Sequence, residues 1–192
     1  MQSGQIGMTS DQYSITLLSP SHVKEGFSCG YDALDNYLIR YATQDIKRHI
    51  TKVYVAHEHK QFQIAGYYAI SAYSYERQAL PVKQAKRLPP YHHIPAAILG
   101  RLAVDTRHQG HGLGEVLLLD AFERIMRAHR TLAVHAVIAD AKDERAKAFY
   151  QHYGFTAFPE TPLQLFLPVK TIEMLLDEMV SVDSPNTICE PA

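Results

Sequence analysis

The sequence lacks the features that mark membrane, secreted and disulfide-rich proteins. Its 192 residues contain no run of about 18 apolar residues, so no transmembrane helix is expected. The polar segment 1–13 has no basic start followed by an apolar stretch, which argues against a signal peptide. Cys29 and Cys189 are the only cysteines, so we expect no disulfide framework and a reducing, cytoplasmic location.

Metal-binding patterns are missing as well. The 11 histidines are scattered along the chain, and His92 and His93 are adjacent rather than four residues apart. Neither an HExxH nor a CxxC pattern occurs. We therefore expect no metal site.

Charge is balanced over the whole chain but not along it. A net charge of −1 gives no sign of a nucleic-acid-binding protein. Basic residues nevertheless gather in two clusters that could contact phosphates, which are Arg40, Lys47, Arg48 and Lys52, and Arg77, Lys83, Lys86 and Arg87. Taken alone, either cluster is more typical of an ordinary solvated face.

The length and the 46% hydrophobic content suit one domain with a full core. We expect that domain to span 1–182, with a flexible leader over 1–12 and a flexible tail over 183–192. Apolar periodicity predicts strands over 13–18, 52–57, 62–75, 96–105, 131–139, 155–158 and 164–169. It predicts helices from about residue 21, over 31–48, near 82–87, over 113–130 and over 140–153, while 171–180 fits a strand or a short helix. This order predicts an α/β protein with a mixed sheet and helices on both faces.

The most informative segment is the glycine-rich turn between the strand that ends near Asp105 and the helix that begins near Leu113. Arg107, Gly110 and Gly112 fall in the pattern Gln/Arg-x-x-Gly-x-Gly/Ala. Glycines let the backbone approach a ligand closely, and free amides at a helix start bind anions such as a pyrophosphate. The spacing is not that of a Rossmann unit, and no Gly-Lys-Ser/Thr follows, which excludes a P-loop. An ordinary strand–helix turn is the simpler alternative.

That turn resembles the acetyl-CoA site of the GNAT N-acetyltransferase superfamily, and three ordered blocks make the resemblance narrower. The first covers 22–38 and contains His22, Phe27, Cys29-Gly30 and Leu34-Asp35. The second joins Gly66-Tyr67-Tyr68 to Leu99–Asp105, and the third is the stretch 140–155 around Ala148-Phe149-Tyr150. Together they resemble the GNAT toxins of bacterial toxin–antitoxin modules, over roughly residues 13–172.

The resemblance implies a GNAT fold, with a central twisted sheet splayed between its fourth and fifth strands. It implies transfer of an acetyl group from acetyl-CoA to the free α-amine of aminoacyl-tRNA, which stops translation. It also implies a ribbon-helix-helix antitoxin as partner, contact with DNA only through that antitoxin, a homodimer, and no membrane partner.

The resemblance also assigns site residues. The cofactor would contact the backbone of the central strand, the glycine turn and the following helices, with Arg107 adding charge at the pyrophosphate: Leu102, Ala103, Val104, Arg107, His108, Gln109, Gly110, His111, Gly112, Leu113, Gly114, Ala141 and Phe149. The acceptor tRNA would contact Arg40, Lys47, Arg48, Lys83, Lys86, Arg87 and Arg101, and Arg101 could instead pair internally or at a dimer interface.

Tyr150 matches the catalytic tyrosine of the family. A phenol at the sulfur can donate a hydrogen bond or a proton to the departing thiolate. Because tyrosine has a pKa of about 10 and a thiol about 8.5, Tyr150 should orient and stabilise more than it protonates. Tyr153 is better suited to packing, and Asp105 and Glu76 are the candidate bases.

Two other functions remain open. A GNAT enzyme could acetylate a small amine or a protein lysine, but an α-amine has a pKa near 8 against about 10.4 for lysine, which mildly favours an aminoacyl acceptor. The chain could also be a non-catalytic acyl-CoA-binding subunit that assembles with a DNA-binding partner, against which Tyr150 counts.

Overall fold

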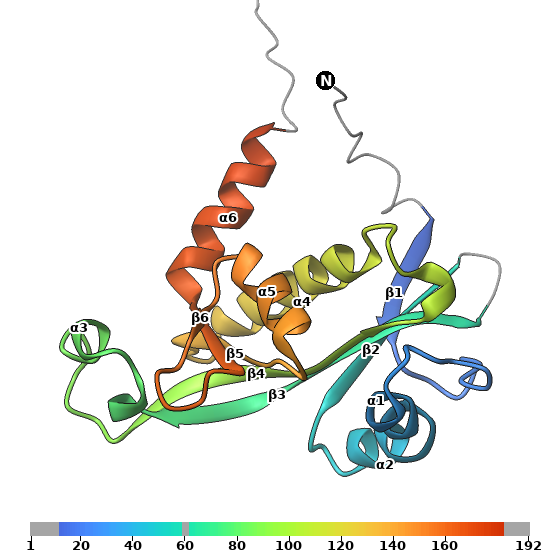
Figure 1. Ribbon diagram of the computed structural model, residues 1–192, viewed down its shortest axis with the longest axis horizontal. Coiled ribbons are helices and arrows are strands. Elements are labelled where there is room, and N and C mark those ends of the chain that lie inside the picture. The colour runs from blue at the N-terminus through green and yellow to red at the C-terminus, as the bar shows by residue number, and fades with distance from the viewer. Residues whose placement is uncertain (1–11, 59–61, 183–192) are drawn as a thin grey trace, which may run out of the picture.

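The computed structural model describes residues 12–58 and 62–182 (Figure 1). The predicted leader and tail fall mainly on 1–11 and 183–192, which lie outside the described residues. Among the described residues, no helix is both long and apolar enough to cross a membrane.

Within 12–58 and 62–182, seven strands form one mixed sheet in the order β1-β2-β3-β4-β5-β7-β6. Every neighbouring pair is antiparallel except β4 and β5, which run parallel. The strands are β1 Tyr13–Leu17, β2 Lys52–Glu58, β3 Ile64–Glu76, β4 His93–Val104, β5 Ala136–Asp140, β6 Thr156–Ala157 and β7 Gln164–Pro168. The predicted mixed sheet is confirmed.

Helices cover both faces of this sheet (Figure 1). On one face lie α1, a π-helical turn η1 and α2, whose Leu38 and Tyr37 pack against β2 and β3. On the other lie α4 and α5, and α6 packs its Ile172 into the same core. The bounds are α1 Asp32–Asn36, η1 Tyr37–Tyr41, α2 Ala42–Lys47, α3 Val82–Ala85, α4 Leu113–His129, α5 Glu144–His152 and α6 Val169–Val182.

The sheet is splayed where β4 leaves β5, as the resemblance implied. The two strands pair only from Ala96 to Leu99, opposite 136–139. Just beyond that point Ala69 of β3 faces Arg101 while Ile70 faces Leu99, so Gly100 is an extra residue in β4. Such a bulge bends a strand and increases its twist. Among the described residues, the edge of β4 over 101–104 therefore has no strand partner on the β5 side.

The structure corrects several expected boundaries. No helix forms from residue 21, because Gly26 and Gly30 adopt φ values of 78° and 85°, in the left-handed region, and keep this segment irregular. The strand expected over 131–139 begins only at Ala136, after a turn that closes α4. The segment 171–180 lies within the longer helix α6, whose buried and half-buried residues recur at helical spacing.

Candidate active site

The glycine turn presents a row of unpaired amides at the end of β4. Asp105 begins the short 3₁₀ turn Thr106–His108, and Gly110 and Gly112 then take φ values of 80° and 82°. Gly112 is also the N-cap of α4. Within the described parts of the chain, none of the backbone amides from 109 to 114 donates to a carbonyl. Free amides at the start of a 17-residue helix form an anion site.

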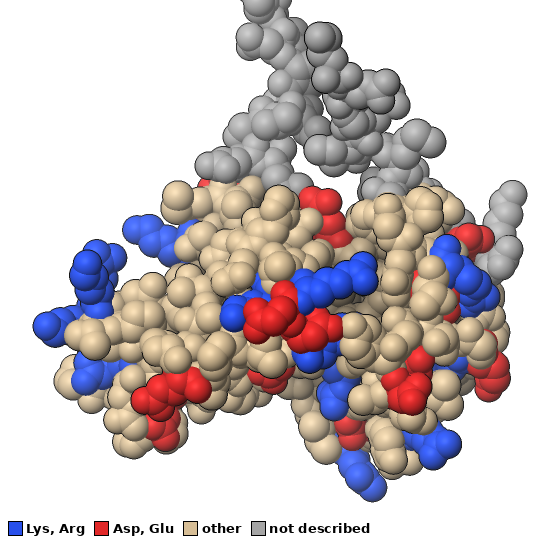
Figure 2. Space-filling view, in the orientation of Figure 1, with Lys and Arg blue, Asp and Glu red and all other residues tan. Residues whose placement is uncertain are grey.

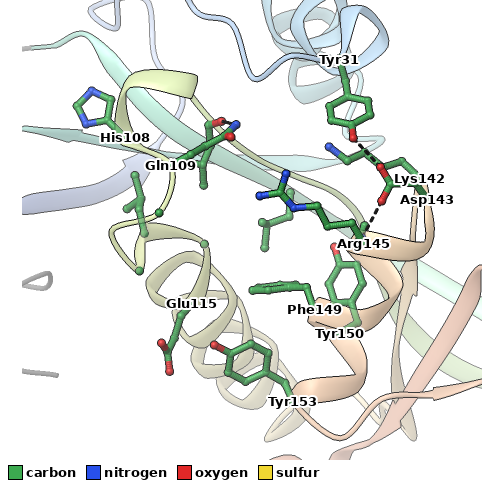
Figure 3. A pocket seen from close by; sticks show the side chains of 17 residues that line it. Tyr31, His108, Gln109, Glu115, Lys142, Asp143, Arg145, Phe149, Tyr150 and Tyr153 are labelled. Carbon is green, nitrogen blue, oxygen red and sulfur yellow. Dashed lines mark hydrogen bonds between the residues drawn. The ribbon is translucent and has the colours of Figure 1, made fainter. Parts of the chain in front are cut away.

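A pocket of about 330 Å³ joins this turn to α5 (Figure 3). Ten of the residues predicted from the sequence line it, and they are Leu102, Val104, His108, Gln109, Gly110, Gly112, Leu113, Gly114, Phe149 and Tyr150. The structure therefore gathers the strand edge, the anion-binding turn and the candidate catalytic tyrosine around one space.

Four predicted cofactor residues have side chains outside the pocket wall: Ala103, Arg107, His111 and Ala141. Side chains alternate between the two faces of β4, so the Ala103 side chain packs in the core on the η1 face of the sheet. The backbone of Ala103 still lies on the open edge of the strand. Arg107 is turned toward Asp105, with Nε 2.8 Å from Oδ1 and Nη2 2.9 Å from Oδ2. Its charge is thus directed at a buried carboxylate rather than at the pocket.

Neither candidate base lies in the pocket. Asp105 is only 1% exposed, and besides Arg107 it accepts a 3.1 Å hydrogen bond from the Ser28 amide. Burial opposes its ionisation, but these hydrogen bonds outweigh that effect and lower the pKa of Asp105. Glu76 ends β3 ten residues from Gly66, the partner of Val104, which is about 30 Å along a strand. Asp105 is a structural anion, and Glu76 is too distant to act.

Tyr150 lies in the last turns of α5 and is 4% exposed. Its ring contacts Phe149 and Phe155, with centroids 5.4 and 5.3 Å away. Burial, with a smaller effect from Asp140, raises the pKa of Tyr150, so the phenol stays protonated at neutral pH. Its hydroxyl is therefore a donor and not a base.

Tyr153 also lines the pocket, although the sequence predicted only a packing role for it. It faces Glu115 across the pocket (Figure 3). Burial and that carboxylate raise the pKa of Tyr153 to about 12. Tyr153 is consequently a second neutral phenol at the pocket, on the α4 side.

Sequence reasoning missed the polar residues at the other end of the pocket, which are Tyr31, Lys142, Asp143 and Arg145. Asp143 had a local signal, because it precedes α5 and its Oδ1 accepts from the Ala146 amide at 2.7 Å, as a helix N-cap does. No local signal could have placed Tyr31 beside it, since 112 residues separate the two.

The predicted tRNA-binding residues do not form one patch. Lys83, Lys86 and Arg87 belong to α3 and its end, at the tip of the β3–β4 arm, whereas the group on η1 and α2 lies at the other end of the molecule (Figures 1 and 2). The residues of both groups are exposed, which are Lys83, Lys86 and Arg87 and Arg40, Lys47 and Arg48. Arg101 has its guanidinium carbon 3.5 Å from the centre of the Tyr37 ring on η1, so it pairs internally.

Among the described residues, no group of three or more His, Cys, Asp and Glu side chains could hold a metal ion. The pocket offers amides, phenols and an open strand edge instead. Such an arrangement suits a long anionic ligand that carries amide groups along its length.

The sequence pattern of the acetyltransferase (GNAT) domain matches residues 49–157, which is more than half of the chain. The chain belongs to the GNAT acetyltransferase family. A probable toxin TacT of Sinorhizobium fredii is 32% identical over 162 residues, covering 81% of this chain and 90% of the relative. A tRNA-acetylating toxin of Mycobacterium tuberculosis is 32% identical over 152 residues, covering 79% and 89%.

Solved structures agree with this family. AtaT complexed with acetyl-methionyl-tRNAfMet has a TM-score of 0.79 and 31% identity, covering 85% of this chain and 99% of AtaT. A tyrosine-to-phenylalanine mutant of AtaT, bound to the C-terminus of the antitoxin AtaR and acetyl-CoA, has a TM-score of 0.73 and 27% identity, covering 86% and 99%. A KacTA–DNA complex has a TM-score of 0.75 and 29% identity, covering 87% and 99%. These comparisons confirm the GNAT fold and family predicted from the sequence.

Proposed function

We propose that the protein is a toxin that moves the acetyl group of acetyl-CoA to the α-amine of aminoacyl-tRNA in the cytoplasm and so blocks translation. The observation that carries this proposal is the pocket that joins the unpaired amides of the glycine turn to the Tyr150 phenol along an open strand edge. The tRNA-acetylating relative and the acetyl-methionyl-tRNA bound to AtaT support this choice of acceptor.

The cofactor fits the pocket in three segments. The amides of 109–114 bind the pyrophosphate. The backbone of Leu102, Ala103 and Val104, left open by the splay, pairs with the pantetheine amides as an added strand would. Phe149 and Leu113 supply apolar walls, and Ala141 lies buried behind them at the end of β5. Arg107 acts indirectly in this arrangement, by fixing Asp105 at the base of the turn.

Tyr150 is the catalytic residue of this proposal. Its raised pKa keeps the hydroxyl protonated, so it can donate a hydrogen bond to the sulfur as the carbon–sulfur bond breaks. Asp105 does not act as the base, because it is committed to Arg107 and Ser28. An α-amine with a pKa near 8 supplies its own neutral fraction at neutral pH, which a lysine with a pKa of about 10.4 does not.

The partners follow from the same assignment. The exposed basic groups at α3 and at η1–α2 bind the phosphates of the acceptor tRNA. An antitoxin neutralises the enzyme and carries the complex to DNA, as the AtaT–AtaR and KacTA–DNA structures suggest by similarity. Residues 1–182 contain one acetyltransferase domain, which we expect to form a homodimer.

Mass spectrometry of total charged tRNA, incubated with acetyl-CoA and the purified protein, tests the proposal. We expect N-acetyl-aminoacyl-adenosine after nuclease digestion with the wild type, and at least about a hundredfold less with Tyr150→Phe. The amino acid found in the product identifies the preferred tRNA. Absence of product from a protein that still binds acetyl-CoA would redirect the assignment to a small amine or a protein lysine.

A further inference from the structure

A single tyrosine bridges the two walls of the pocket at its polar end. The Tyr31 hydroxyl donates a 2.6 Å hydrogen bond to Asp143 Oδ2. The Lys142 ammonium lies over the same ring, 2.9 Å from its centre. Tyr31 precedes α1 on one face of the sheet, and Asp143 precedes α5 on the other. The side chain therefore spans the gap where β4 and β5 diverge.

The segment that carries Tyr31 is itself tied to the cofactor turn. The Gln109 side-chain amide donates both to the Cys29 carbonyl, at 3.1 Å, and to the Val104 carbonyl, at 2.9 Å. The Ser28 amide donates to Asp105, and the Ser28 carbonyl accepts from Thr106 at 2.8 Å. These hydrogen bonds fix the backbone of 28–31 against the glycine turn. The backbone of Tyr31 is therefore held in place, and its side chain can extend to Asp143.

Tyr31 lies at the end of the pocket toward which the Tyr150 hydroxyl points (Figure 3). The glycine turn with its free amides occupies the opposite wall. If the pyrophosphate lies on that turn and the thioester lies at Tyr150, the amine must approach from the end that Tyr31 bounds. With 38% of its surface exposed, Tyr31 can meet both the acceptor and solvent.

We propose that Tyr31 is a positioning residue of the acceptor end, where its ring, fixed by Asp143 and Lys142, forms the wall beside the incoming aminoacyl group and shields the thioester from water. This inference rests on the proposed function. A closed wall favours attack by the amine, whereas an open one lets water attack the same carbonyl and release acetate and free CoA. Tyr31 therefore controls how much acetyl-CoA is spent on transfer rather than on hydrolysis.

The test compares Tyr31→Phe and Tyr31→Ala with a matched control, Tyr41→Ala, whose ring is 53% exposed on η1 and does not line the pocket. Chromatography measures CoA release with and without charged tRNA, and calorimetry measures acetyl-CoA binding. In Tyr31→Ala we expect the ratio of hydrolysis to transfer to rise about tenfold, with acetyl-CoA affinity within about twofold of wild type. Tyr31→Phe keeps the wall and loses the hydrogen bond, so its ratio should rise about threefold.

Asp143→Ser separates the bridge from a general effect on folding, because serine still caps α5 but has no second oxygen to accept from Tyr31. If the bridge operates as a unit, Tyr31→Phe and Asp143→Ser combined should change the ratio no more than the larger single effect. An unchanged ratio in Tyr31→Ala, or a change matched by Tyr41→Ala or by lost acetyl-CoA binding, would overturn the proposal. Should the wild type fail to acetylate charged tRNA, the proposed function fails, and CoA release without tRNA alone decides the role of Tyr31.

Discussion

The Tyr13 hydroxyl lies 2.8 Å from His108 Nδ1 and joins β1, at the edge of the sheet, to the glycine turn. The two rings meet edge to face, with centroids 5.8 Å apart. Because His108 also lines the pocket, the first strand of the chain fixes one wall of the cofactor site.

Tyr13→Phe should loosen that wall while leaving the strand in place. Loss of one partly buried hydrogen bond costs about 1 kcal/mol, so we expect acetyl-CoA affinity to fall about three- to fivefold. Isothermal titration calorimetry measures this directly. Tyr91→Phe, at a tyrosine that is 66% exposed and lies before the end of β4 opposite to the turn, is the matched control and should bind as the wild type does. Equal affinities for both variants would mean that the turn is rigid without β1.

Backbone conformation should matter more than side chains within the turn. Gly112 has a φ of 82°, where a Cβ costs about 1–2 kcal/mol, so Gly112→Val should displace the amides of 113 and 114 and lower acetyl-CoA affinity at least about tenfold. His111→Ala, at an exposed neighbour whose side chain lies outside the pocket wall, should stay within about twofold. Fluorescence displacement of a CoA analogue ranks the two variants. The reverse ranking would show that side chains, not amides, bind the anion.

Removal of the buried anion beneath the turn should have a pH-dependent effect on stability. The folded-state pKa of Asp105 is lowered, so its carboxylate stabilises the fold fully above the ordinary aspartate pKa of about 3.9 and progressively less as the pH falls through the folded-state value. Asp105→Ala should therefore lower the free energy of unfolding by about 1–3 kcal/mol at pH 7. The difference in free energy of unfolding between wild type and variant should become smaller toward pH 3. Urea unfolding followed by circular dichroism at both pH values checks this, and a gap that does not change with pH would contradict it.

The basic residues at the tip of the β3–β4 arm should affect tRNA binding and not acetyl-CoA binding. Replacing Lys83, Lys86 and Arg87 by glutamate adds repulsion at a site far from the glycine turn, so tRNA affinity should fall at least about tenfold at low salt, with a shallower salt dependence. Filter binding over a range of salt concentrations measures both effects, and acetyl-CoA affinity should not change. A folded triple variant with normal tRNA affinity would exclude α3 from the interface. The same reversal at Arg40, Lys47 and Arg48 tells whether the opposite group contributes.

The parts of the site that sequence reasoning found are those encoded locally. Glycine spacing at 110 and 112 predicted a turn that lets the backbone approach an anion, and apolar spacing predicted α4 and α5, because both signals operate within a few residues. The direction of the Arg107 side chain was missed because it depends on the burial of Asp105 under Ser28, which is 77 residues away in sequence. The same holds for the bridge from Tyr31 to Asp143, which only the folded sheet brings together.

The divergence of β4 from β5 also affects the tendency of the protein to aggregate. An unpaired strand edge on a protein surface invites another chain to add to it, and that leads to aggregation. Here the unpaired edge over 101–104 opens inside the sheet, between a strand that continues and one that turns away. Because β5 still pairs with β4 over 96–99, a second polypeptide strand cannot extend along the whole of this edge, whereas a short arm with spaced amides needs only the stretch 101–104. The fold thus leaves open an edge that is too short to favour self-association and long enough to bind a small linear guest.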